Sequence, residues 1–126
     1  MDRMERAREL RAITEVHYNC CQSVLVPYAD RLGLTEEQAY ALGAHFGSGM
    51  RHGSTCGALT GALMVLGMTG YGEQEARQLL GEFHQTNGCT DCAGLLASCK
   101  ARGEEKKPHC DRMVYQCIEA LERLLG

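Results

Sequence analysis

The chain has 126 residues, a net charge of -3 and eight cysteines. This length predicts one domain with a modest core, and the weakly acidic charge gives no reason to expect nucleic-acid binding. The longest apolar run falls well short of the roughly 20 residues of a membrane span, so we expect a soluble protein with no membrane partner.

The first 18 residues are expected to form an N-terminal surface helix. Met4, Ala7, Leu10 and Ile13 recur at helical spacing between Asp2 and about Val16. The arginines and glutamates between them favour a solvated face with local ion pairs. This charged start, with no apolar signal region behind it, predicts a cytoplasmic location, where clustered cysteines bind metal or act in redox chemistry rather than form structural bridges.

Two helices are predicted next, each with a recognisable cap. Asn19 can cap a helix that carries Cys20 in its first turn and Cys21 on its buried face. Pro27 should kink or split this helix, and Gly33 closes it. A capping box then starts at Thr35, and its helix is expected to end at Gly47.

A glycine-rich loop, residues 47–56, leads into an apolar helix of small residues that is expected to be central, residues 57–68. It delivers Cys56 to the helix N-terminus, where a thiolate is favoured. Because one buried cysteine is more often packing than chemistry, the other seven decide the interpretation. Four glycines are predicted to line a cofactor, either by turning N–H groups toward sulfur or by leaving a helix face open: Gly49, Gly53, Gly57 and Gly61.

A second cysteine-bearing segment opens with the CxxC pair Cys89 and Cys92, whose spacing lets two sulfurs meet one metal or form one disulfide. Ala93 follows where haem attachment requires histidine, and no second CxxC or histidine pair completes a zinc finger. The last helix is predicted to begin near Cys110, with Cys117 in its buried stripe.

Cysteines therefore stand at several predicted helix starts, which a core built for apolar volume does not require. These are Cys20, Cys56 and Cys110, together with Cys92. His52 and His109 lie close to two of them in sequence and are weaker candidates for ligands. The chain shows no Ser-His-Asp order and no paired acids, so no catalytic residue is predicted.

From Asn19 to its end, the sequence resembles the C_GCAxxG_C_C family of redox-active proteins from anaerobic bacteria and archaea. The resemblance lies in Asn19-Cys20-Cys21-Gln22, Gly47-Ser48-Gly49-Met50, the box Cys56-Gly57-Ala58-Leu59-Thr60-Gly61, Cys92 before Leu95-Leu96, and Cys110. It implies Cys20, Cys56, Cys92 and Cys110 as the family cysteines, with Cys99 a frequent fifth. The additional Cys21, Cys89 and Cys117 leave the ligand set open, since Cys21 can replace Cys20 and Cys89 can replace Cys92.

The family is similar to a domain of the split-Soret cytochromes, and this similarity implies an iron–sulfur cluster without the haem. We expect an all-α single domain over residues 1–126, a bundle of about six helices with its core in residues 19–126 and its cysteine-bearing helix ends on one side. The expected function is electron transfer or redox sensing with a redox partner protein, and a homodimer is compatible with the apolar helices. The alternatives are thiol–disulfide exchange at Cys56 or at Cys89 and Cys92, and a structural zinc site.

Overall fold

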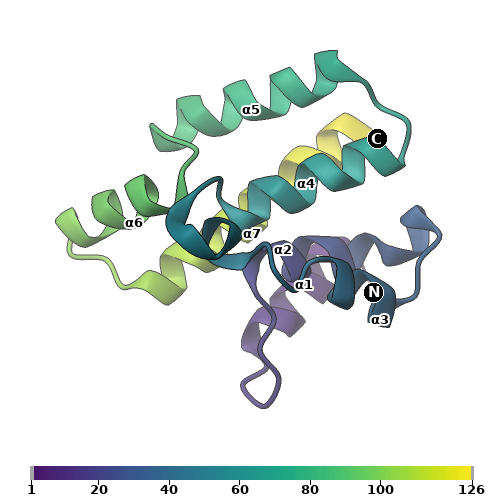
Figure 1. The fold of residues 1–126 in the computed structure, drawn as a ribbon, viewed down its shortest axis with the longest axis horizontal. Helices are drawn as coiled ribbons and strands as arrows, with labels where there is room; N and C mark the ends of the chain where they lie inside the picture. Colours follow the sequence, from purple (N-terminus) through teal and green to yellow (C-terminus); the bar gives the residue numbers. More distant parts are fainter. Residues whose placement is uncertain (1, 126) are drawn as a thin grey trace.

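Helix α4 (Gly57–Met68) lies at the centre of the fold, as its small apolar residues predict (Figure 1). The computed structural model describes residues 2–125, and these residues are helical with no β-strand. The all-α fold is therefore confirmed. The other elements are α1 (Arg3–Ala12), α2 (Cys20–Leu25), the 3₁₀ helix η1 (Val26–Leu32), α3 (Glu36–Leu42), the tight turn η2 (Gly49–Gly53), α5 (Glu73–Asn87), α6 (Cys92–Ala101) and α7 (Lys106–Leu125).

The core forms where α4 packs against α2, α7 and α5 (Figure 1). Gly57 and Gly61 of α4 allow the close approach of α2. A Cβ on Gly57 would lie 3.3 Å from the backbone nitrogen of Cys21, and one on Gly61 would lie 3.0 Å from the carbonyl oxygen of Cys21. Leu59 and Ile118 are fully buried between these helices. Full burial of such side chains stabilises the fold by about 1.5–3 kcal/mol each.

Local signals in the sequence set several of the boundaries as predicted. Pro27 separates α2 from η1, and Gly33 ends η1 in the left-handed conformation with φ of 71°. The capping box at Thr35 is formed, since its hydroxyl accepts from the N–H of Gln38 (3.0 Å) and its own N–H donates to the Gln38 side chain (2.9 Å).

Three predicted boundaries are wrong. Helix α1 ends at Ala12, four residues early, before a stretch that contains the β-branched Ile13 and Thr14, which are weak helix formers. Helix α3 ends at Leu42 because Gly43 caps it. Helix α7 begins at Lys106, before Pro108. The proline is tolerated there because an N–H in the first turn of a helix has no partner within the helix. Cys110 is therefore one turn inside α7 and not at its N-terminus.

Helix α1 packs against α7 and η1 through Ala7 and Leu10, both buried. Helix α6 lies beside η2 and at one end of α4 (Figure 1). This arrangement leaves the N-terminal ends of α2, α4 and α6 near the first turns of α7. Among the described residues, no helix combines the length and the apolar character that crossing a membrane requires.

Candidate metal centre

The four cysteines Cys20, Cys56, Cys92 and Cys110 line one cavity of about 130 Å³. They come from four different elements: the first residue of α2, the N-cap of α4, the first residue of α6 and the second turn of α7. The structure thus brings together the four cysteines that the sequence selected. Their role as metal ligands stays a prediction.

Cys20 is held in place by the cap of α2. The side chain of Asn19 accepts from the N–H of Gln22 (2.8 Å), and the side chain of Gln22 accepts from the N–H of Asn19 (2.9 Å). The amide of Asn19 also donates to the carbonyl of Gly43 (3.1 Å). Gly47 must be a glycine here, because a Cβ on it would lie 2.5 Å from Cβ of Asn19. The segment after α3 therefore fixes the start of α2.

Cys56 and Cys92 are brought together by a short backbone pairing. The N–H of Cys56 donates to the carbonyl of Thr90 (2.9 Å), and the N–H of Cys92 donates to the carbonyl of Ser54 (2.6 Å). Between them, Thr55 and Asp91 form an isolated antiparallel bridge. Backbone hydrogen bonds thus hold the starts of α4 and α6 together.

The glycine loop packs against the start of α6. Gly49 has φ of 62°, and a Cβ on it would lie 2.8 Å from Cβ of Cys92. Gly53 has φ of 78°, and a Cβ on it would lie 3.0 Å from Cβ of Ala93. Ser48, Met50 and Arg51 also have positive φ, a conformation that is strained for residues with a side chain and that occurs often at functional sites.

Of the four glycines predicted to line a cofactor, Gly57 lines the cavity. Its absent side chain also lets Cys20 approach, since a Cβ on Gly57 would lie 3.3 Å from Cβ of Cys20. Gly49, Gly53 and Gly61 instead make room for protein atoms. Their role in the structure is to bring the cysteine-bearing segments close to one another.

Burial outweighs the helix N-terminus at Cys56. Desolvation raises the pKa of its thiol to about 11, although the N–H groups of Leu59 and Ala58 oppose this shift. In the metal-free protein the N–H groups at the helix start lower the pKa of Cys56, as expected there, but burial has the larger effect. The two N–H groups still point to the sulfur, and they come from α4 rather than from the glycine loop.

The thiols of Cys20 and Cys110 influence each other's protonation. Their mutual hydrogen bond raises the pKa of Cys20 well above its usual value and lowers that of Cys110 to about 7. Arg11 and Lys106 also lower the pKa of Cys110 through their positive charges. Cys110 thus gains a lowered pKa from its neighbours and not from a helix terminus.

The remaining cysteines lie outside the cavity lining. Cys21 is buried against Gly61, and Cys117 is buried in the core. Cys89 donates to the carbonyl of Asp91 (3.4 Å) and lies against Gly94. Cys99 belongs to a different cluster, described next. The placement favours Cys20 over Cys21 and Cys92 over Cys89 as candidate ligands.

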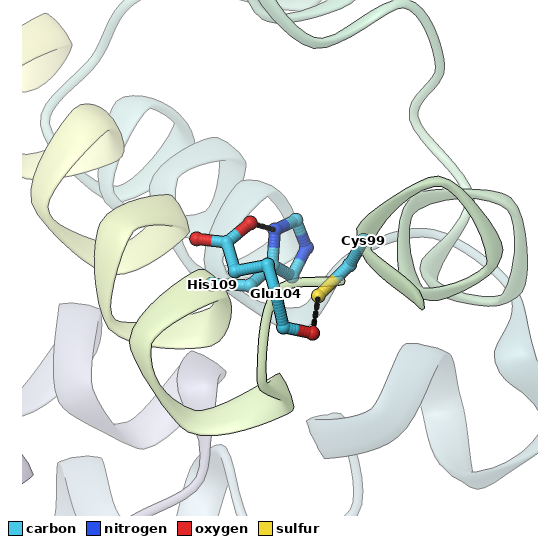
Figure 2. Close-up of side chains that lie close together, drawn as sticks. All are labelled: Cys99, Glu104 and His109. Carbon is cyan, nitrogen blue, oxygen red and sulfur yellow. Dashed lines mark hydrogen bonds and ion pairs between the residues drawn. The ribbon is translucent and has the colours of Figure 1, made fainter. Parts of the chain in front are cut away.

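A second group of metal-binding side chains lies beside the cavity, at the junction of α6 and α7 (Figure 2). It consists of Cys99, Glu104 and His109, whose ligand atoms lie within 4.8 Å of one another. The Cys99 thiol donates to the carbonyl of Glu104 (3.2 Å), and Nδ1 of His109 lies 4.0 Å from Oε1 of Glu104. The sequence does not predict this grouping, because the charged stretch around Glu104 is typical of a solvated loop.

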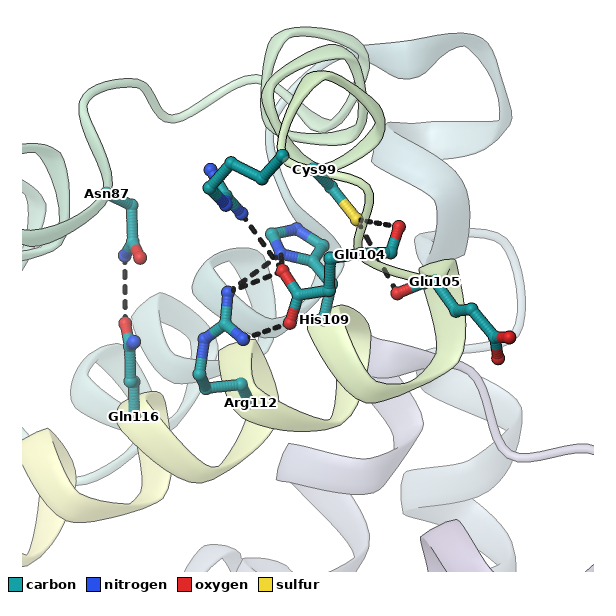
Figure 3. A network of polar contacts seen from close by, with 8 residues as sticks. Asn87, Cys99, Glu104, Glu105, His109, Arg112 and Gln116 are labelled. Atoms are coloured by element: carbon teal, nitrogen blue, oxygen red, sulfur yellow. Dashed lines mark hydrogen bonds and ion pairs between the residues drawn. The ribbon is translucent and has the colours of Figure 1, made fainter.

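Two arginines already bind the carboxylate of this group (Figure 3). Arg112 and Arg102 pair with Glu104 and hold the pKa of its carboxyl at about 2. Burial and the charge of Arg112 lower the pKa of His109, which also lines the cysteine cavity. A cation at Cys99, Glu104 and His109 would have to displace both guanidinium groups. The network fixes His109 in the cavity wall.

The spacing of the cavity cysteines bears on the kind of metal they can hold. Within residues 2–125, no three of their sulfurs lie mutually within 4.8 Å. Two sulfurs on one zinc ion are at most about 4.6 Å apart, twice the Zn–S bond length. Four cysteine thiolates also hold iron–sulfur clusters, in which the ligands are shared among two or four irons. The donor set therefore suits an iron–sulfur cluster or a zinc ion by its chemistry, and holding one ion by three or more of these cysteines requires their side chains to move.

Sequence reasoning missed Arg11 and Lys106, which also line the cavity. Arg11 was assigned to the solvated face of the first helix. It follows the buried Ala7 by four residues, and this spacing places it on the inner face of α1. That signal was present in the sequence.

Of the two weaker histidine candidates, His109 lines the cavity, whereas His52 is exposed outside the lining.

An all-α domain with four cysteines around one cavity defines a cysteine-rich protein of the metal-binding or redox class. The family model described as "Putative redox-active protein (C_GCAxxG_C_C)" matches residues 18–124, so the chain belongs to this family. The match begins after α1. No curated protein and no solved structure matches the chain.

Proposed function

We propose that the protein is an iron–sulfur protein that transfers or senses electrons, with Cys20, Cys56, Cys92 and Cys110 as ligands. The observation that carries the proposal is the cavity itself. Four thiols from four different elements line one space. Thiolate ligation by four cysteines is the usual way in which proteins hold such clusters.

A bound cluster would supply a reversible one-electron change. The chain's own residues set the conditions for it. The N–H groups of Ala58 and Leu59 point to the Cys56 sulfur and stabilise its anionic form. Leu95 and Met113, both buried, line the cavity and reduce the access of water. Hydrogen bonds to sulfur and exclusion of solvent are two of the features by which a protein tunes a cluster.

Cys20, Cys92 and Cys110 are each partly exposed, so the proposed centre lies near the surface. This position supports short-range electron exchange with a partner protein in the cytoplasm. We expect that partner to be a small electron carrier, or a second copy of the chain in a homodimer.

The proposal is tested by anaerobic purification of the full chain, followed by iron, zinc and acid-labile sulfide assays and a visible spectrum. Iron with sulfide and a brown chromophore that bleaches on reduction is the expected result. Zinc alone would replace the proposal with a structural site. A colourless, metal-free protein whose cysteines cycle between thiol and disulfide would replace it with disulfide exchange.

A further inference from the structure

Arg11 contributes a buried positive charge to the cysteine cavity from outside the segment that the family model matches. It lies near the end of α1, and its side chain is only 8% exposed. The guanidinium lines the same cavity as the four cysteines. Burial lowers the pKa of Arg11, but the nearby Cys20, Asp111 and Cys110 more than offset this and keep its pKa above the usual value. The charge is therefore permanent.

The guanidinium is held by two hydrogen bonds from different directions. Its Nε donates to Oδ1 of Asp111 (2.6 Å), and its Nη1 donates to the carbonyl of Tyr18 (2.8 Å). Lys107 donates to the carbonyl of Arg11 (2.8 Å) and to the same carboxylate, at 2.8 Å and 3.0 Å. The residue is thus fixed between α1, the segment before Cys20 and the second turn of α7.

Arg11 and Lys106 are the arginine and lysine side chains that line the cavity within residues 2–125, and Lys106 is exposed. The field of an exposed lysine is strongly weakened by water and salt, whereas that of a buried guanidinium is weakened much less. Arg11 is therefore the cation with the stronger effect on any charge that develops in the cavity.

We propose that the positive charge of Arg11 stabilises the reduced state of the metal centre and so raises its reduction potential. This inference rests on the proposed function. Reduction adds one electron to a site that already holds four thiolates, and a fixed positive charge beside them favours that added negative charge. Asp111 partly neutralises Arg11, so the two side chains have opposite effects on the potential.

The test compares reduction potentials of the purified, metal-loaded full chain by anaerobic titration followed by visible and EPR spectroscopy. The variants are Arg11→Gln, Arg11→Lys and Asp111→Asn. The matched control is Arg8→Gln, which removes the same charge from the same helix. The Arg8 guanidinium lies 4.5 Å from the ring centre of Tyr115 and outside the cavity. Iron and sulfide content and thermal unfolding are measured for every variant.

We expect Arg11→Gln to shift the potential downward and Asp111→Asn to shift it upward, with Arg11→Lys and Arg8→Gln close to wild type. A purely structural role for Arg11 would not produce shifts of opposite sign. Equal potentials in wild type and Arg11→Gln, or a downward shift in Asp111→Asn, would overturn this inference and leave the proposed function intact. If Arg11→Gln fails to fold, the sign for Asp111→Asn decides. A wild-type chain without iron and sulfide overturns the proposed function, and this inference with it.

Discussion

The backbone N–H of Cys92 donates a hydrogen bond to the carbonyl of Ser54 at 2.6 Å. This contact ties the start of α6 to the residues that lead into α4, and so sets Cys92 beside Cys56. The hydrogen bonds of the pairing are made by backbone groups. The backbone pairing thus holds one side of the cavity together.

The first prediction concerns Gly49, which lies beneath this pairing. In Gly49→Ala the new methyl group would lie 2.8 Å from Cβ of Cys92 and would also collide with Ser54, and the residue would be kept at φ of 62°. We expect a loss of about 2 kcal/mol or more in the free energy of unfolding, since a left-handed alanine and a steric clash each cost about 1–2 kcal/mol. Urea denaturation measures this loss.

The matched control for that variant is Gly81→Ala in α5. A Cβ on Gly81 has no neighbour within 4 Å, and the residue lies inside a regular helix. Alanine should stabilise the protein there by about 0.5–1 kcal/mol. If both variants lost stability equally, the close packing described for Gly49 would be wrong.

The second prediction concerns cysteine reactivity in the metal-free, reduced protein. Because hydrogen bonding from Cys20 lowers the pKa of Cys110 to about 7, while burial raises that of Cys56 to about 11, iodoacetamide at pH 7 should modify Cys110 first. We expect the alkylation rate of Cys110 to be at least about tenfold higher than that of Cys56, as measured by peptide mass spectrometry.

Removal of the hydrogen-bond donor checks the cause of this difference. In Cys20→Ala the pKa of Cys110 should rise, because its thiolate loses a donor, and alkylation at pH 7 should slow. Equal rates at Cys110 in this variant and in wild type would show that the thiol pair is not responsible.

The third prediction concerns acid stability. The carboxyl of Glu104 has a pKa of about 2 in the folded protein, against 4.5 for an unperturbed glutamate, because Arg112 and Arg102 bind its charged form. A lowered folded-state pKa stabilises the protein above pH 4.5, and this contribution is lost as the pH falls from 4.5 through 2. Urea midpoints of the metal-free protein should therefore fall more between pH 7 and pH 3 in wild type than in Glu104→Gln.

Salt provides the control for this prediction. The ion pairs of Glu104 are partly exposed, so 1 M salt should reduce the difference between the two proteins at pH 7. The assignment to Glu104 would fail if the variant showed the full acid loss of wild type.

Local chemistry made much of the fold predictable. Pro27, Gly33 and the capping box at Thr35 act on their immediate neighbours, and each set the predicted boundary. The central position of α4 followed from its small apolar residues. The start of α7 is not predictable in the same way, because the charged residues of its first turn, before Cys110, are also typical of a solvated loop.

The four cavity cysteines were also selected in advance, partly for a reason that the structure corrects. Cys20 and Cys56 do stand at helix starts, but Cys110 lies inside α7. The sequence does not predict the role of Arg11, because its ion pair with Asp111 joins residues 100 positions apart and depends on how the helices pack. It does not predict the Glu104 network either, because that network depends on the conformation of the turn between α6 and α7. No local sequence pattern predicts that Asp111 forms an ion pair with Arg11.

The most direct measurement is the iron and acid-labile sulfide content per chain of single cysteine variants purified anaerobically. Alanine at Cys20, Cys56, Cys92 or Cys110 should abolish or strongly reduce both, whereas Cys89→Ala and Cys99→Ala should retain the wild-type content. These two controls lie close to the cavity without lining it. Full cluster content in Cys56→Ala, or its loss in Cys89→Ala but not in Cys92→Ala, would contradict the assignment of the cavity as the metal centre.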